Sequence, residues 1–425
     1  MTSDKDKKHD LIVVCQLFYP ELVSTGQTLT ELVEELASYG LKIKVIASQP
    51  TILSDEKKVS EDIDYKGIKV IRTWSTRFPK IHFWGKLINL TTFFFSASFE
   101  VLFRNRNTPL LLLTNPPYLP ILGWLNYLFK KINYGVLLFD IMPEQAELLK
   151  LVKPKGPLSK IWRFLNSIWY KKASYVVVLS EDMLNGAIEN ANLLNNKHEK
   201  ACREKTHIIH VWSDDRIIIP TKKSCSSETI RLGVNGKFVI QYSGNHGRFH
   251  DVETLLGIVD KLKDDEDIIF QFIGEGFKKR LVDEFKKFRK LNNMYSSTYV
   301  EKNELSDSLA MADIGVVAQL PGQEKVCYPS KLLGIMASGR PIFAICPLNC
   351  EMAHMIRRNE LGFVIENGDI EGGVKLIRSI KKEKELLSKM GMNSYNYLQD
   401  FFTLEKAAKK YYKLILESNN IDNGK

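Results

Sequence analysis

The chain has 425 residues, well above the roughly 150 residues of a typical single domain, so two domains are expected. Its hydrophobic share of 44% and charged share of 26% are those of a globular protein and exclude a disordered chain. The net charge of +10 suits a phosphate-bearing substrate, nucleic acid or an anionic membrane surface, and does not choose among them.

The first nine residues are polar and lack the apolar core of a signal peptide, so the chain is expected to stay in the cytoplasm. Six cysteines are scattered along the chain without the spacing of zinc ligands. Reduced, mostly structural thiols are therefore expected.

Short apolar runs alternate with longer helical patterns through the first half. Near-continuous apolar runs predict buried parallel strands, because helices cover both faces of such a sheet. Between the first two runs, Leu29, Leu32 and Leu36 form the apolar stripe of a helix that ends near Gly40. The predicted strands span residues 11–15, 43–47, 68–72, 110–114, 135–139 and 175–179.

Residues 72–103 form an unusual basic, aromatic and apolar segment. The apolar part, 87–103, stops short of the about 20 residues that span a bilayer. Two interpretations stay open: a helix buried against the sheet, or a patch that rests on an anionic membrane. The residues proposed for such a patch are Trp74, Arg77, Phe83, Trp84 and Lys86.

The same alternation restarts after a polar linker at 221–236. Strands are predicted at 237–242, 268–274, 314–319 and 341–345. Two successive series of this kind predict an α/β protein with two doubly wound, Rossmann-like domains. The acidic runs at 61–64 and 264–267 are interpreted as a polar loop and a turn, and no metal site is predicted.

Ligands of open α/β sheets bind beyond the carboxyl ends of the strands. After the first predicted strand, Thr25 and Gly26 offer a glycine-bearing loop at a helix N-terminus, which can bind an anion or serve as a plain turn. The segment is not a GxGxxG motif, which argues against a dehydrogenase-type dinucleotide site. After the fifth strand, Asp140 and Glu144 can orient an acceptor hydroxyl or act as a base, although Asp140 can also cap the next helix.

The strongest anion-binding signal follows the strand at 237–242. Gly244 and Gly247 free the backbone, Arg248 and His250 supply donors, and a helix is predicted to begin near Asp251. A flexible turn, cations and a helix N-terminus together favour binding of a diphosphate.

Two further segments contribute to this predicted diphosphate site. Gly274 and Gly276 open the next loop, and Lys279 can reach a phosphate. Ser330 lies at a predicted helix start with Lys331 beside it, which gives a second cluster of donors.

Seven stretches resemble the retaining glycosyltransferases of group 1, family 4, in the branch that builds O-antigen, colanic acid and capsule. They are FYPELVSTGQTLTELVEELASYG, DIMPE, YVVVLSEDM, HVWSDD, YSGNHGRFHDVETLL, FIGEG and PSKLLGIMASGRP. The resemblance implies the GT-B fold, in which two Rossmann-like domains face a central cleft. It implies an acceptor-binding domain at 1–220, a nucleotide-sugar-binding domain at 221–400, and a final helix at 401–425 that crosses back to the first domain.

The resemblance implies transfer of a sugar from a nucleoside diphosphate sugar, with a UDP-sugar favoured, to a lipid-linked or saccharide acceptor with retained configuration. The basic and aromatic residues 72–86 leave open a peripheral place at the inner face of the plasma membrane. No nucleic-acid-binding module is recognisable, so no nucleic acid partner is expected, and no cofactor is expected either. The catalytic residues would be Asp140, Glu144, Arg248 and Lys331, with Asn245 joining the loop residues in donor binding.

Some family features are absent from this sequence. Asn245 and His250 stand where many members carry Arg and Lys, and Val326 and Gly334 replace two glutamates, the second of which normally holds the ribose. A non-catalytic partner subunit of a glycosyltransferase complex is the alternative that these departures leave open.

Overall fold

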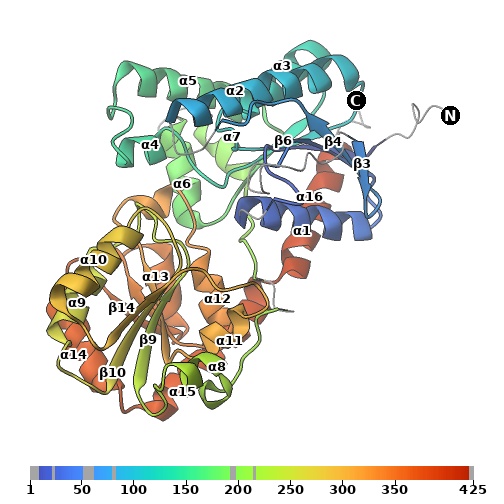
Figure 1. Ribbon diagram of the computed structural model, residues 1–425. Coiled ribbons are helices and arrows are strands. Elements are labelled where there is room, and N and C mark those ends of the chain that lie inside the picture. The colour runs from blue at the N-terminus through green and yellow to red at the C-terminus, as the bar shows by residue number, and fades with distance from the viewer. Residues whose placement is uncertain are drawn as a thin grey trace. The chain divides into compact units, whose positions relative to one another are not determined.

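The computed structural model describes residues 9–21, 24–50, 62–78, 83–191, 198–213 and 217–420. The chain divides into two compact units, each built on its own sheet (Figure 1). Unit 1 comprises Met1–His210, Lys325–Cys327 and Leu404–Lys425, and unit 2 comprises Val211–Glu324 and Tyr328–Thr403.

The sheet of unit 1 has eight strands in the order β3-β4-β2-β1-β5-β6-β7-β8. All neighbours are parallel except β3 and β4. The central strands are fully buried, as helices on both faces require. The strands are β1 Leu11–Val14, β2 Ile43–Ser48, β3 Asp62–Tyr65, β4 Ile68–Thr73, β5 Leu110–Leu113, β6 Tyr134–Leu137, β7 Tyr175–Val178 and β8 Thr206–Ile208.

Helices cover this sheet, and the last helix of the chain, α16, belongs to unit 1. It packs against α1, where the rings of Tyr39 and Tyr412 meet edge to face at 5.6 Å. In Figure 1 the dark blue α1 and the red α16 lie together, and α2, α3 and α5 form a separate layer of the unit. The helices are α1 Ser24–Ser38, α2 Phe83–Phe99, the π-helix η1 Glu100–Arg104, α3 Pro120–Lys130, α4 Glu144–Leu148, α5 Pro157–Lys172, α6 Glu181–Asn190, α7 Glu199–Glu204 and α16 Leu404–Asn420.

The sheet of unit 2 has six parallel strands in the order β11-β10-β9-β12-β13-β14. Its core joins these strands to α9, α10 and α14 through fully buried aliphatic and aromatic side chains. The elements are η2 Lys223–Cys225, α8 Ser227–Arg231, β9 Phe238–Ser243, α9 Val252–Lys261, β10 Ile268–Ile273, α10 Lys279–Arg289, β11 Met294–Ser297, α11 Leu305–Ala310, β12 Ile314–Ala318, η3 Gln323–Lys325, α12 Lys331–Ala337, β13 Ile342–Ile345, α13 Glu351–Arg358, β14 Gly362–Ile365, α14 Ile370–Ile380 and α15 Lys384–Phe401.

Two Rossmann-like sheets confirm the predicted α/β class, and every run predicted as a strand forms one. The prediction for residues 61–64 as a polar loop was wrong, because 62–64 lie in β3. This strand pairs with β4 through a tight turn in which Lys66 and Gly67 both have positive φ (53° and 79°). Positive φ at both central residues matches the right-handed twist of a hairpin.

The segment 72–103 has one buried side and one exposed side. Phe93, Ala97 and Val101 are fully buried, which confirms the buried-helix interpretation for that side of α2 and η1. The loop before the helix exposes Trp74, and Arg77 is exposed as well. Lys86 is exposed in the first turn of α2, whereas the side chains of Phe83 and Trp84 lie outside the described part of the chain.

Candidate functional site

The β9–α9 loop, residues 244–251, lies at the carboxyl end of the unit 2 sheet. Strand order reverses at β9, because β10 and β11 lie on one side of it and β12, β13 and β14 on the other. Open α/β sheets bind ligands at such a switch point. The strongest anion-binding signal in the sequence therefore lies where the topology of the sheet favours a ligand.

Helix α9 begins where the sequence predicted, and its N-terminus already holds a carboxylate. Asp251 accepts hydrogen bonds from the Thr254 amide at 3.1 Å and the Thr254 hydroxyl at 2.7 Å. Asn367 donates to the same carboxylate at 2.7 Å. Because the Asp251 carboxylate already places a negative charge at this helix end, the arrangement favours diphosphate binding to the loop itself over binding to the first turn of α9.

The loop amides open to a ligand differ from those that the sequence suggested. The Gly244 amide donates to the Ile273 carbonyl at 2.9 Å, and the Gly247 amide donates to His250 Nδ1 at 3.1 Å. Within the described residues, the amides of Asn245, Arg248, Phe249 and Asp251 donate no hydrogen bond. These four amides, in place of the two glycine amides, are the free backbone donors of this loop.

Gly274 and Gly276 hold the β10–α10 loop, residues 274–278, against the β9–α9 loop. Both have positive φ (125° and 139°). A Cβ on Gly274 would lie 2.1 Å from the Gly244 carbonyl oxygen, and one on Gly276 would lie 2.3 Å from Asn245 Oδ1. These glycines therefore permit a close approach of two loops, a role different from the flexible opening that the sequence suggested.

Lys331 joins this site from the start of α12. Its Nζ lies 3.4 Å from the centre of the Tyr242 ring and donates to the Asn245 carbonyl at 3.3 Å. Burial lowers the pKa of Lys331 well below the ordinary value of 10.5. The side chain is half-buried, and in the described part of the chain no carboxylate pairs with it, so this ammonium lacks a negative partner. Ser330 precedes it with an exposed side chain that does not cap the helix.

Two histidines of the loop are held in the neutral form. Burial, helped by the nearby Lys331 charge, lowers the pKa of His246 to about 4 and that of His250 to about 3. His250 Nδ1 lies 2.7 Å from the Tyr242 hydroxyl. His246 is fully buried, and neither of its ring nitrogens has a hydrogen-bond partner among the described residues. His246 was not predicted as a site residue from the sequence, although it lies inside the loop with the strongest anion-binding signal.

Arg248 and Lys279 differ in their freedom to meet an anion. The Arg248 guanidinium is exposed and lies 3.6 Å from the centre of the Phe277 ring, a cation–π contact that leaves its N–H groups available. Lys279 instead pairs with Asp283 at 3.1 Å and donates to Ser296. Lys279 is thus already engaged, so the structure argues against the direct phosphate contact predicted for it.

In unit 1, Asp140 follows β6 and makes a β-bridge with Cys327. Gln145 donates to its carboxylate at 2.6 Å. Burial raises the pKa of Asp140 above the ordinary value, and the hydrogen bond from Gln145 and the charge of Lys86 oppose this only in part. Asp140 does not cap α4, whose N-cap is Pro143 and carries no side-chain cap.

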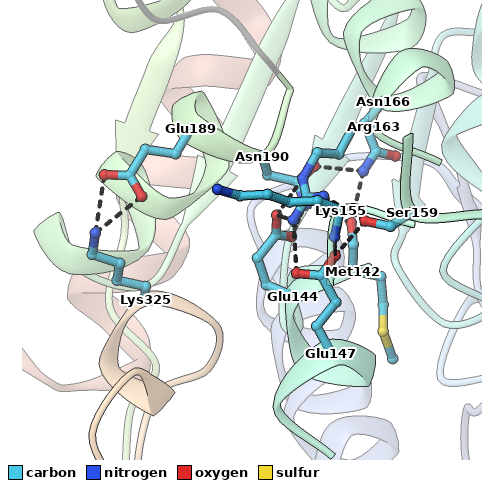
Figure 2. Close-up of polar contacts among 10 residues, drawn as sticks. All are labelled: Met142, Glu144, Glu147, Lys155, Ser159, Arg163, Asn166, Glu189, Asn190 and Lys325. Carbon is cyan, nitrogen blue, oxygen red and sulfur yellow. Dashed lines mark hydrogen bonds and ion pairs between the residues drawn. The ribbon is translucent and has the colours of Figure 1, made fainter. Parts of the chain in front are cut away.

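Glu144 lies in a tight polar network, so the structure does not support it as a free base (Figure 2). Arg163 donates a hydrogen bond to Glu144 Oε1 at 2.9 Å, and Asn190 donates one to Glu144 Oε2. Arg163 also pairs with Glu147 at 2.8 Å, and Asn190 donates to the Met142 carbonyl at 2.7 Å. Glu144 therefore serves to hold the segment after Asp140 in place.

Thr25 and Gly26 lie in the first turn of α1, after its start at Ser24, and not in the loop before it. The Gly26 carbonyl accepts the Thr30 hydroxyl at 2.8 Å. A Cβ on Gly26 would lie 3.4 Å from side-chain atoms of Glu21 and Leu17. The glycine thus fits a close helix–loop contact, and its predicted part in anion binding stays a prediction.

The positions of the two absent glutamates are filled by apolar packing. Val326 is buried, and a Cβ on Gly334 would contact Leu309 and Ile218. Nearby Glu324 accepts the Gly322 amide at 2.8 Å. In the residues that the structure describes, no group of three or more His, Cys, Asp or Glu side chains is placed to hold a metal ion.

Residues 230–397 match the family model "Glycosyl transferases group 1". The chain is 27% identical over 333 residues to a glycosyltransferase named WbjE of Pseudomonas aeruginosa, covering 75% of this chain and 76% of the relative. It is 25% identical over 336 residues to WcaI of Escherichia coli, named as a colanic acid biosynthesis glycosyl transferase, covering 76% and 79%.

Solved structures show the same fold. Sucrose-phosphate synthase from Thermosynechococcus elongatus superposes with a TM-score of 0.71 at 13% identity, over 96% of this chain and 98% of that one. HepE of Anabaena, solved in complex with UDP-glucose, superposes with a TM-score of 0.66 at 13% identity, over 97% and 100%. The two Rossmann-like units thus form a GT-B fold, as the resemblance implied.

Proposed function

We propose that this chain is a group 1 glycosyltransferase that moves a sugar from a nucleoside diphosphate sugar, with a UDP-sugar favoured, to a lipid-linked or saccharide acceptor with retained configuration. Its product would enter cell-surface polysaccharide, as the name of the colanic acid relative suggests for that protein. Unit 2 would hold the donor, unit 1 would present the acceptor, and the enzyme would work at the inner face of the plasma membrane.

The single observation that carries this proposal is the Lys331 ammonium beside the β9–α9 loop, which is half-buried and has no carboxylate partner among the described residues. A partly desolvated cation without a counter-charge costs free energy, which an anionic ligand relieves. The free amides of Asn245 and Arg248 and the Arg248 guanidinium add donors around the same loop. This arrangement suits a diphosphate, which carries negative charge and many acceptor oxygens.

The same groups suit the chemistry of the transfer. Negative charge grows on the diphosphate as its bond to the sugar breaks and the sugar becomes oxocarbenium-like. Donors fixed beforehand around the leaving group stabilise that charge without reorganisation. We assign Lys331 and Arg248 to the departing diphosphate, and Asp140, whose raised pKa marks a desolvated carboxylate, to the acceptor side.

Binding of nucleotides to the full chain tests the donor assignment. A ligand at 100 times its dissociation constant stabilises a fold by about 2.7 kcal/mol, which thermal unfolding detects. We expect UDP to stabilise the protein more than GDP, ADP or CDP at equal concentration. The absence of stabilisation by all four nucleotides would exclude the proposed donor site. A larger effect of GDP or another nucleotide would retain the site and change the base.

A further inference from the structure

Unit 1 exposes an aromatic stripe along α2 and η1. Phe95, Phe99 and Phe103 recur every four residues and are 67%, 52% and 75% exposed. A helix that packs only against its own sheet buries its apolar positions and exposes polar ones. Here both sides of the helix are apolar, so the outer stripe needs a different explanation.

The neighbouring helices expose apolar side chains as well. On α3, Leu128 is 48% and Phe129 70% exposed, and Leu158, Ile161 and Phe164 of α5 are all more than half exposed. The α5 residues recur every three positions, so they share one side of that helix. We call the exposed apolar side chains of α2, η1, α3 and α5 the three-helix face.

The helices that carry the three-helix face are neighbours, because α3 packs against both η1 and α5. Lys130, at the end of α3, donates to the Asn105 carbonyl just after η1. Figure 1 shows α2, α3 and α5 as one layer of unit 1. An exposed apolar surface that extends over several helices marks a site of interaction with a partner or a membrane.

Helix α2 is bound too firmly to its own unit to leave it and cross a bilayer. Residues Gly85–Arg104 have the length and composition of a membrane-spanning helix, but this alone is weak support, because core helices share both properties. Asn89 exchanges hydrogen bonds with the Phe78 backbone at 2.9 Å, and the Ser96 hydroxyl donates to the Trp74 carbonyl at 2.6 Å. With Phe93 buried against the unit as well, the helix lies along the surface.

The charge around the three-helix face is strongly positive. Residues 83–172 contain twelve lysines and arginines but only four acidic residues, which accounts for most of the net charge of +10. Three of these carboxylates, Glu100, Glu144 and Glu147, pair with arginines. The fourth, Asp140, has a pKa raised by burial. The lysines exposed around the face, among them Lys131, Lys153 and Lys160, thus meet little opposing charge.

We propose that the three-helix face is a membrane-docking surface that rests on a bilayer containing anionic lipid. The exposed phenylalanines would enter the boundary between headgroups and acyl chains, and the lysines would contact lipid phosphates. This inference rests on the proposed function at the membrane and identifies the part of the protein that would contact the bilayer. It extends the contact from residues 72–86 to α3 and α5, which the sequence did not single out, and places a lipid-linked acceptor near unit 1.

Vesicle flotation of the full chain tests the docking surface. We expect the wild type to float with vesicles of phosphatidylcholine and phosphatidylglycerol, and much less with phosphatidylcholine alone. The triple variant F95S/F103S/F129S should lose about 90% or more of this binding at every salt concentration. The variant I230S/M392S, which changes two exposed apolar residues of unit 2, should float as the wild type does.

A charge variant separates the two contributions. K131E/K153E/K160E should bind anionic vesicles several-fold more weakly, and the deficit should shrink as salt screens the charges. All variants should keep the wild-type unfolding temperature and its increase with UDP, which shows that unit 2 still binds donor. Loss of the UDP effect with retained flotation would refute the donor proposal alone.

Three results would overturn the docking surface. The wild type could fail to float with anionic vesicles at low salt, or the phenylalanine variant could float as well as the wild type. Light scattering could instead show that the wild type is a dimer that F95S/F103S/F129S converts to a monomer, without vesicle binding by either. That last result would assign the face to a second copy of the chain.

Discussion

The Nζ atom of Lys331 lies 3.4 Å from the centre of the Tyr242 ring. In the described residues this ammonium has no carboxylate partner, and its remaining protein contact is the Asn245 carbonyl. The ring partly compensates the charge, because its face is negative. An anionic ligand would therefore stabilise the charged form of Lys331, which has no counter-charge in the ligand-free protein.

The variant Lys331→Met should weaken UDP binding by about 10- to 100-fold, because hydrogen bonds to a charged group contribute about 1.5–3 kcal/mol. Burial lowers the pKa of Lys331 in the folded protein below its value of 10.5 in the unfolded chain. At neutral pH this lysine therefore reduces the free energy of unfolding, and the reduction disappears only above pH 10.5. The ligand-free variant should consequently be at least as stable as the wild type. Titration calorimetry and thermal unfolding check both expectations. A variant that loses stability but binds UDP normally would contradict the assignment.

Arg248→Ala should lower kcat/KM by about 10- to 100-fold with a change in unfolding free energy within about 0.5 kcal/mol, because the side chain is exposed. Arg248→Lys should recover only part of the activity, since a lysine lacks the planar fork and the stacking on Phe277. Arg280→Ala is the matched control, because Arg280 is an exposed arginine that pairs with Glu284 on α10. Equal losses in the Arg248 and Arg280 variants would indicate a general charge effect.

Gly276→Ala should destabilise unit 2 by about 1–3 kcal/mol and weaken donor binding, because its Cβ would collide with Asn245 Oδ1 and with the His246 backbone. Gly233→Ala is a suitable control. Gly233 also has positive φ (64°), but its Cβ would meet nothing within 4 Å. If both variants bind UDP equally well, the close contact between the two loops does not shape the site. Urea unfolding and calorimetry provide the measurements.

The sequence predicted the inner strands of both sheets but missed β3, β8, β11 and β14. These are the four outermost strands. An outer strand has a neighbour on one side only and is partly exposed, so it does not need the continuous apolar run that marks a central strand. The acidic DIDY of β3 and the polar MYSS of β11 show this directly.

The sequence located the β9–α9 loop but not the state of its groups. The Gly244 amide is bonded to Ile273, which is distant in sequence. Lys279 is paired with Asp283, which lies one turn further along α10. Burial of Lys331 and His246 depends on packing between loops, which no local pattern encodes. Residue type thus indicated where an anion binds, and tertiary contacts decide which donors remain for it.

Arg163→Met should destabilise unit 1 by about 3 kcal/mol, because it leaves Glu144 and Glu147 without their shared partner (Figure 2). Lys409→Met, which breaks an exposed ion pair with Glu405 in the same unit, should change stability by less than about 1 kcal/mol. Unfolding in urea, followed by tryptophan fluorescence, gives both values. Similar effects of the two variants would show that the network contributes no more than a surface pair.

This network also predicts a dependence on pH. Burial would raise the pKa of Glu147, but hydrogen bonds from Arg163 and Ser159 outweigh it and hold the pKa below the ordinary value of 4.5. The resulting stability is present above pH 4.5 and is lost as the pH falls through the lowered value. Glu147→Gln should remove this part of the acid dependence of unit 1.

Asp140→Asn should affect stability and activity in opposite directions. The pKa of Asp140 is raised by burial, so its ionised form opposes folding, and stability falls as the pH rises from 3.8 through the raised value. At neutral pH the asparagine variant should therefore be as stable as the wild type or more so. If Asp140 ionises to engage the acceptor hydroxyl, the same variant should lose about 100-fold or more in kcat.

The pH profile of kcat/KM separates a direct role of Asp140 from a structural one. The wild-type rate should rise with pH as the carboxylate ionises, and Asp140→Asn should lack that rise. Gln145→Met removes the hydrogen bond that favours the ionised form, so the rise should move to higher pH without a loss of the maximal rate. An unchanged profile in Gln145→Met, together with full activity in Asp140→Asn, would assign acceptor activation to another group, because a carboxylate that an amide can replace without loss of rate is not the required base.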